Sequence, residues 1–117
     1  MDITRYHTGK RMSEVVVHGN TVYTAGQVAQ NAPGASVTEQ TKDILATMDA
    51  LLAEAGTDRS KLLTATIWLN AMDDFAEMNA VWDSWVVPGS TPCRACVESP
   101  KLASPKFTVE IMAIAAL

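Results

Sequence analysis

The chain has 117 residues, and 13 acidic against 9 basic side chains give it a formal net charge of −4 at pH 7. This length suits a single domain over residues 1–117. The chain is acidic and has no basic cluster, which argues against a nucleic-acid partner because Lys and Arg supply most nonspecific affinity for phosphate. No apolar run approaches the roughly 20 residues of a membrane helix, and the N-terminus lacks a signal peptide's apolar segment, so we expect a cytoplasmic protein without a membrane partner.

Two strands are predicted in the first thirty residues. Residues 14–18 (EVVVH) and 21–29 (TVYTAGQVA) are rich in β-branched side chains. The segment His18-Gly19-Asn20 between them is typical of a tight turn. We therefore expect a β-hairpin here.

A helix is predicted after the turn-forming segment QNAPGAS. Ser36 and Glu39 have the spacing of a capping box, and Gly56 suits a C-terminal cap, so the helix should run from Ser36 to about Ala55. Its apolar positions recur at three- and four-residue spacing on one face. They are Ile44, Leu45, Met48, Leu51, Leu52 and Ala55.

The next segments repeat this alternation. Residues 62–70 (LLTATIWLN) are apolar and β-branched enough for a central strand, and Met72-Asp73-Asp74 then supplies an N-cap for a second helix. Pro88 and Gly89 stop that helix. Its apolar stripe consists of Phe75, Met78, Val81, Trp82 and Trp85. We expect the two tryptophans to be core or interface anchors.

Two more strands are predicted at residues 93–99 (CRACVES) and within 106–117 (KFTVEIMAIAAL). The resulting order, ββαβαββ, predicts an α+β domain with a mostly antiparallel sheet and two helices on one face. Hydrophobic residues make up 48% of the chain, which is high for so small a domain. We interpret this surplus as a buried interface between subunits.

Arg94 and Glu110 are charged residues inside the two apolar C-terminal strands. Because removing a charge from water is unfavourable unless a partner compensates, they either pair with each other or face a ligand. Alternation along the strand places Arg94 on one face with Cys96 and Glu98, so arginine and glutamate could line one cleft. We expect Glu98 to be a rim carboxylate rather than a second acid.

Cys93 and Cys96 form a C-x-x-C pair, which suggests redox chemistry, a metal site, or two small buried residues. A redox pair needs its first cysteine at a helix N-terminus, whereas these cysteines lie in a strand-like run. A zinc site needs two further ligands, and His7 and His18 lie far away without ligand spacing. The third interpretation is favoured, and we expect His18 to be a turn residue.

Three long motifs carry a family resemblance. They are RMSEVVVHGNTVYTAGQVA, ATIWLNAMDDFAEMNAVWDSWV and PCRACVESPKLASPKFTVEIMAIAA. In their order and spacing, over nearly all residues, the chain resembles the RidA (YjgF) family of imine deaminases, and within it the YoaB-like branch. The resemblance implies a chorismate-mutase-like α+β subunit that forms a homotrimer with an active cleft at each subunit interface.

The resemblance also implies a reaction. Members hydrolyse reactive 2-imino acids to 2-keto acids and ammonia without a cofactor or metal, so the implied partners are a small 2-imino or 2-keto acid and further copies of the chain. Arg94 matches the arginine that binds the substrate carboxylate, and Glu110 the glutamate that orients and deprotonates the attacking water. Asn79 matches a cleft asparagine. Gly26 and Cys96 match positions whose main chain lines the pocket.

One position departs from the family pattern, because Met12 stands where the best-studied members have a tyrosine. Methionine can form an apolar wall but cannot donate a hydrogen bond to a leaving amine or hold a water. We therefore expect substrate preference to differ.

Other interpretations remain open at this point. Arg94 and Glu110 could form a structural ion pair within or between subunits, and Asn79 could be a polar break at the edge of an amphipathic helix. The main functional alternative is a noncatalytic trimer that binds small carboxylate metabolites and regulates metabolism. A ribonuclease activity, also attributed to relatives, is disfavoured by the acidic charge.

Overall fold

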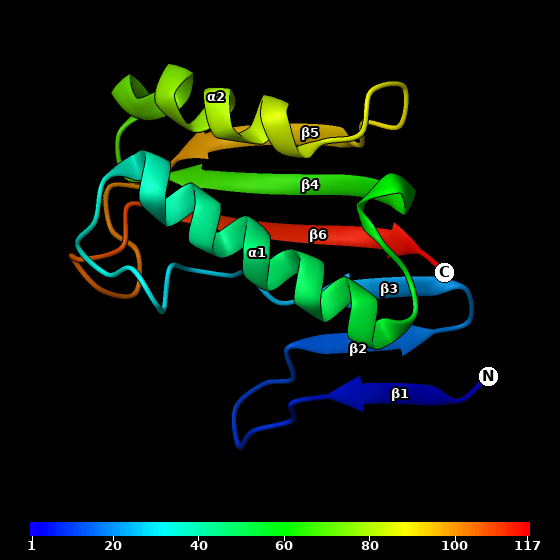
Figure 1. The fold of residues 1–117 in the computed structure, drawn as a ribbon. Coiled ribbons are helices and arrows are strands. Elements are labelled where there is room, and N and C mark those ends of the chain that lie inside the picture. Colours follow the sequence, from blue (N-terminus) through cyan, green and yellow to red (C-terminus); the bar gives the residue numbers. More distant parts are fainter.

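The computed structural model describes all 117 residues. Its strands form one sheet, which two helices cover on one side (Figure 1). The elements are β1 (Ile3–Tyr6), β2 (Val15–His18), β3 (Thr21–Thr24), α1 (Val37–Ala55), β4 (Leu62–Leu69), α2 (Phe75–Trp85), β5 (Cys93–Glu98) and β6 (Val109–Ala116), with 3₁₀ turns at Arg59–Lys61 and Met72–Asp74. The strand order is β1-β2-β3-β6-β4-β5, and only β4 and β5 pair in parallel. The predicted α+β class, with a mostly antiparallel sheet and both helices on one face, is confirmed.

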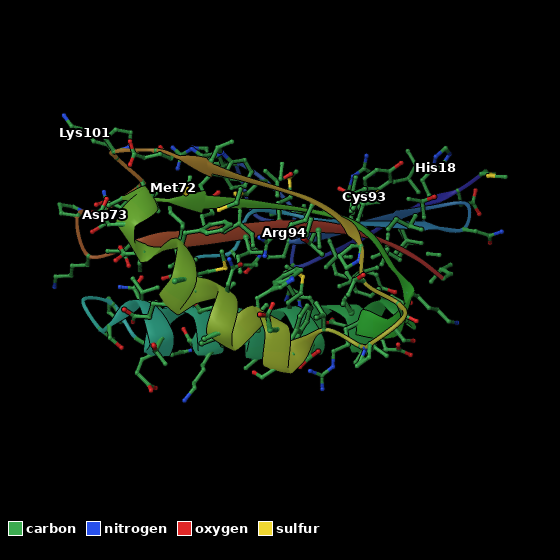
Figure 2. All side chains as sticks on the ribbon, turned by 90° about the horizontal axis from the view of Figure 1, so that it is seen from above. His18, Met72, Asp73, Cys93, Arg94 and Lys101 are labelled. Carbon is green, nitrogen blue, oxygen red and sulfur yellow. The ribbon has the colours of Figure 1, made fainter.

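The hydrophobic core fills the space between the sheet and the helices. Alternate residues of β4 and β6, such as Ile67 and Ile111, are completely or almost completely buried under α1, whose own buried side includes Ile44, Met48 and Leu52. Because strand side chains alternate, the other half of each strand points to the opposite face. Figure 2 shows that no helix covers that face, which we call the open face.

The caps of α1 follow the sequence prediction. Ser36 is the N-cap, and its hydroxyl accepts a hydrogen bond from the Glu39 backbone N–H at 3.2 Å. Gly56 ends the helix with a φ of 92°, in the left-handed region that glycine adopts without strain. Neither helix is long and apolar enough to cross a membrane.

Two strand predictions need correction. The sequence interpretation missed β1, whose four residues are too few and too polar to show a clear alternation, although they pair with β2 from Ile3 opposite His18 to Tyr6 opposite Val15. The second predicted strand is too long, because β3 ends at Thr24. Only Gln27 continues the pairing, through an isolated bridge to Ile111.

The start of α2 also differs from the prediction. Its N-cap, Asp74, makes no side-chain capping bond. Instead the Glu98 carboxylate accepts a hydrogen bond from the Met72 N–H at 2.9 Å, which gives Glu98 a structural role. Trp82 and Trp85 are buried as expected, but Phe75 of the predicted stripe is 39% exposed because its ring lies at the edge of the helix layer, beside Arg94.

The Glu77 carboxylate joins α2 to the N-terminus of α1. Glu77 on α2 accepts hydrogen bonds from the backbone N–H and the hydroxyl of Thr38, at 2.8 and 2.9 Å, in the first turn of α1. The Thr38 N–H has no partner within its own helix, because it lies in the first turn. The negative charge of Glu77 is also favourable next to the N-terminus of α1.

Replacing Glu77 with Ala should therefore lower the free energy of unfolding by about 1 kcal/mol. For a domain of this size, that corresponds to a fall in Tm of roughly 3–6 °C by calorimetry. Asp83→Ala, on the same helix but without a hydrogen-bond or ion-pair partner, is the control and should shift Tm little. Equal shifts for the two variants would contradict this role of Glu77.

Candidate active site

Arg94 lies on the edge strand β5 and points into the helix layer (Figure 2). Its Nη1 donates a hydrogen bond to the Asn79 side-chain oxygen at 2.8 Å. The guanidinium carbon lies 5.5 Å from the centre of the Trp82 ring and 5.7 Å from that of Phe75. These contacts hold the planar group in place, and no carboxylate of the chain pairs with it. The remaining donors of Arg94 are therefore available to a planar anion such as a carboxylate.

Cys96 lies beside Arg94 on the same face of β5, opposite Ile67 of β4. Partial burial raises the pKa of its thiol, and the nearby Arg94 charge offsets part of this effect. Cys93 is exposed and points to the other face, so the interpretation of both cysteines as small buried residues is wrong for Cys93. Three residues along a strand span about 10 Å, too far for a disulfide, so C-x-x-C is not a redox pair here. No group of three or more His, Cys, Asp or Glu side chains is placed to hold a metal ion.

Glu110 lies on β6 and points to the open face, where its strand partner is Trp68 of β4. Removal from water raises the pKa of its carboxyl, because burial disfavours the charged form. The carboxylate lies against the backbone of Gly26, where a Cβ atom would come within 2.2 Å of Oε2. Glycine at this position therefore creates the space that Glu110 occupies.

A cavity of about 450 Å³ opens beside Glu110. Its lining residues include Met12, Glu14, Gly26, Gln27, Gln30 and Glu110. Met12 is 49% exposed. The cavity therefore brings together three of the predicted site residues, Met12, Gly26 and Glu110.

Within one chain, however, the sheet separates Arg94 from Glu110. Arg94 pairs with Ala65 of β4 and Glu110 pairs with Trp68, three residues further along the same strand. Positions three apart on a strand point to opposite faces. The expectation that both side chains line one cleft is thus wrong for a single subunit, and so is an ion pair between them within the chain.

The predicted site residues divide into two groups. We call Arg94, Asn79 and Cys96, on the helix side of β5, the arginine half-site. We call Met12, Gly26 and Glu110, on the open face, the glutamate half-site. The sequence interpretation did not identify Phe75 and Trp82 as neighbours of Arg94. It also missed Glu14 and Gln27 in the cavity, although Glu14 is a charged residue directly before an apolar strand.

Gly26→Ala should leave the fold intact and displace the Glu110 carboxylate. The φ of Gly26 is not positive, so alanine fits the backbone, but its Cβ would overlap Oε2, Cδ and Cγ of Glu110. We expect a fall of at least about tenfold in any activity that depends on this carboxylate, since a misplacement of about 1 Å can reduce rates 10²-fold. The measurement is kcat/KM together with Tm.

Gly9→Ala is the matched control, because its Cβ would make only an ordinary 3.5 Å contact with the Met12 carbonyl oxygen and its φ is not positive either. Unchanged kcat/KM in Gly26→Ala would show that the position of the Glu110 carboxylate does not matter.

Comparison with known proteins places these features in a family. Residues 3–117 match the family model described as Endoribonuclease L-PSP. The chain is 46% identical over 115 residues to a RutC family protein of Haemophilus influenzae, covering 98% of both chains, and 44% identical over 117 residues to the RutC family protein YoaB of Escherichia coli, covering 100% of both. A crystal structure of a YjgF family member from Neisseria meningitidis superposes with a TM-score of 0.95 at 46% identity, covering 99% of this chain and 95% of the other.

Proposed function

We propose a function on the premise that this chain belongs to the endoribonuclease L-PSP family of RidA (YjgF) and RutC proteins, and to its YoaB-like branch. The proposed reaction is the hydrolysis of reactive 2-imino acids to 2-keto acids and ammonia. The observation that carries the proposal is the pair of half-sites. One presents an oriented arginine without a carboxylate partner, and the other a partly buried glutamate beside a cavity. These are the two groups that the reaction requires.

The arginine half-site supplies the anchor. A guanidinium forms two parallel charge-assisted hydrogen bonds with a carboxylate, which fixes both the position and the rotation of the substrate. The hydrogen bond to Asn79 and the rings of Phe75 and Trp82 support this role, because they restrict Arg94 before substrate arrives. The imine carbon is then held next to the anchored carboxylate.

The glutamate half-site supplies the base. The substrate reacts as the protonated imine, and the Glu110 carboxylate takes a proton from a water as that water attacks the imine carbon, which gives a neutral carbinolamine. The same carboxyl then donates the proton to the nitrogen, the C–N bond breaks, and loss of the hydroxyl proton leaves the 2-keto acid and ammonium. A raised pKa suits this exchange, because it strengthens the base and lets the carboxyl hold the proton between the two steps.

We propose that the two half-sites meet between subunits of a homotrimer, with the arginine half-site of one copy facing the glutamate half-site of another. The open face supports association, because it presents apolar side chains over which no helix packs. They include Val16, Trp68, Val97, Met112, Ile114 and Tyr23, the last of which is 43% exposed. Uncovered apolar area of this kind marks an interface.

The test uses an imine generated in the assay. A serine or threonine dehydratase produces the 2-imino acid, semicarbazide intercepts it, and the adduct is followed by absorbance. The protein should lower adduct formation in proportion to its concentration. Unchanged adduct formation with folded, trimeric protein would refute the deaminase proposal, and a folded monomer in light scattering would refute the intersubunit site.

Met12 favours one alternative, a noncatalytic trimer that binds small carboxylates with a regulatory role, because methionine supplies no donor for the leaving amine. The two functions give different results with 2-oxobutanoate. A binder is stabilised against heat by the keto acid yet leaves the lifetime of the imine unchanged, whereas the deaminase shortens that lifetime.

A further inference from the structure

Three successive turns of α2 present side chains to the Arg94 guanidinium. They carry Phe75, Asn79 and Trp82, whose spacings of four and three residues place them one above the other on the same side of the helix. Asn79, in the middle, accepts the hydrogen bond from Nη1 of Arg94 at 2.8 Å. Along the helix, Arg94 therefore meets an aromatic ring, an amide and a second aromatic ring in series.

The guanidinium lies between the two rings. Its central carbon is 5.7 Å from the centre of the Phe75 ring and 5.5 Å from that of Trp82. Residues seven apart on an α-helix are separated by about 10.5 Å along its axis, so a group at these distances from both rings is enclosed by them. The face of an aromatic ring is its electronegative part and attracts the cation from either side. We call Phe75 and Trp82 the aromatic clamp.

The two rings of the aromatic clamp differ in burial. Trp82 is 5% exposed, and its ring packs against that of Trp85, whose Nε1 donates to Asp49 at 3.1 Å. Phe75 is 39% exposed and belongs neither to the hydrophobic core nor to the partly buried side chains packed against it. Core packing therefore accounts for Trp82, whereas the contact with Arg94 accounts for the place of Phe75.

A fixed guanidinium matters for binding a carboxylate. Two parallel hydrogen bonds form only when the planar group has the right position and rotation. A mobile arginine side chain loses conformational freedom when a ligand orders it, and this loss weakens binding. Because no carboxylate of the chain pairs with Arg94, the clamp and Asn79 supply its order.

We infer that Phe75 is a positioning residue for carboxylate binding, which acts by holding the Arg94 guanidinium against Trp82 in the orientation that receives the ligand. This inference rests on the proposed function and adds a residue to its arginine half-site. The substrate carboxylate is bound before and during the reaction alike. Phe75 therefore acts on the affinity for substrate and leaves the rate of the bound substrate unchanged.

Phe75→Leu tests the ring. Leucine is apolar but has no aromatic face, and the exposed site can accept it without disturbing the core. In calorimetric titration of the full trimeric protein with 2-oxobutanoate, Kd should rise about three- to tenfold, the range expected for a lost cation–π contact. KM for the imine should rise by a similar factor while kcat stays within about twofold.

Phe75→Tyr is the conservative control, because tyrosine keeps the aromatic face. It should hold Kd within about twofold of wild type. The Tm of both variants should stay close to that of wild type, which shows that a change in Kd does not come from a damaged fold.

The same substitution in an Arg94→Lys background tests whether Phe75 acts through Arg94. An ammonium has no plane to orient, so Phe75→Leu should there change Kd by less than about twofold. A loss of full size in this background would mean that the ring contacts the ligand itself, and would overturn the inference. Unchanged Kd in Phe75→Leu, equal losses in the leucine and tyrosine variants, or no binding of 2-oxobutanoate by wild type would overturn it as well.

The outcomes also separate this inference from the proposed function. A Phe75 effect on 2-oxobutanoate that depends on Arg94, without hydrolysis of any imine, would refute the deaminase and retain the positioning role. Imine hydrolysis that is insensitive to Phe75→Leu would retain the deaminase and refute the positioning role.

Discussion

Glu110→Gln should reduce kcat/KM for imine hydrolysis by about 10²–10⁴-fold, the range typical of a lost general base. Glutamine has nearly the same shape and can remain beside Gly26, but it cannot take a proton from water. The fold should persist, since the carboxylate forms no hydrogen bond or ion pair within the chain. The measurement is the semicarbazide assay, with circular dichroism and Tm to show that the variant is folded.

The pH profile of the wild type should carry the same signature. In the proposed mechanism the base works as a carboxylate, so kcat/KM should fall as acidification protonates Glu110. Because burial raises the pKa of this group, the fall should begin at a higher pH than an ordinary glutamate would give. In Glu110→Gln the residual activity should lack this acidic limb.

The control for this pair of measurements is Glu54→Gln, whose carboxylate pairs with His7 at 2.7 Å on the outer side of the molecule. It should keep both the rate and the acidic limb. An acidic limb that survives in Glu110→Gln would assign the base to another group.

Arg94→Lys should lower kcat/KM by about 10- to 100-fold, even though the positive charge remains. Lysine presents a single ammonium in place of a planar pair of donors, so it cannot hold a carboxylate through two parallel hydrogen bonds, and hydrogen bonds to charged groups contribute about 1.5–3 kcal/mol. We expect the loss to include a weaker affinity for 2-oxobutanoate. Kinetics and calorimetric titration measure the two effects.

Arg59→Lys is the matched control. Its guanidinium also lies over a tryptophan ring, 5.5 Å from the centre of Trp85, but it pairs with Asp49 and belongs to neither half-site. This variant should keep its kcat/KM. A comparable loss in both variants would indicate a general effect of replacing arginine, and full activity in Arg94→Lys would remove Arg94 as the carboxylate anchor.

Mixed trimers combine these two predictions. If Arg94 and Glu110 act in one site from different copies, then co-expressed Arg94→Ala and Glu110→Gln chains, each strongly impaired alone, can form an intact site where the two kinds of subunit meet. Random assembly restores roughly a quarter of the sites in a cyclic trimer. Confirmed mixed trimers without recovered activity would contradict the intersubunit arrangement.

The predicted elements with strong periodicity agree best with the structure. The helix from Ser36 to Ala55 has both caps and a full apolar stripe, and its bounds differ from the observed α1 by one residue. The four residues of β1 offer no such pattern, because their order depends on pairing with β2. Likewise, the strand-like composition of residues 25–29 does not reveal that β3 ends at Thr24.

Chemical types at the candidate site were predictable, but their arrangement was not. Arg94 and Glu110 stand out because charges are unusual inside apolar strands, and Asn79 was expected in the cleft only through the family resemblance. Their contacts depend on other segments: Asn79 meets Arg94 only because α2 packs on β5. Nothing in the order of residues near position 14 indicates that the Gln27 amide donates to the Glu14 carboxylate and to the Ala25 carbonyl oxygen.

The sequence alone determined which residues form the two helices, most of the strands and the alternation of core and surface within each, because these depend on neighbours at fixed spacing along the chain. Only the tertiary structure decided which face of the sheet each strand residue occupies relative to the others. That outcome depends on register between strands far apart in sequence, and a shift of one residue would turn Arg94 or Glu110 to the other face. The division into two half-sites, and with it the reason for a site between subunits, follows from that register.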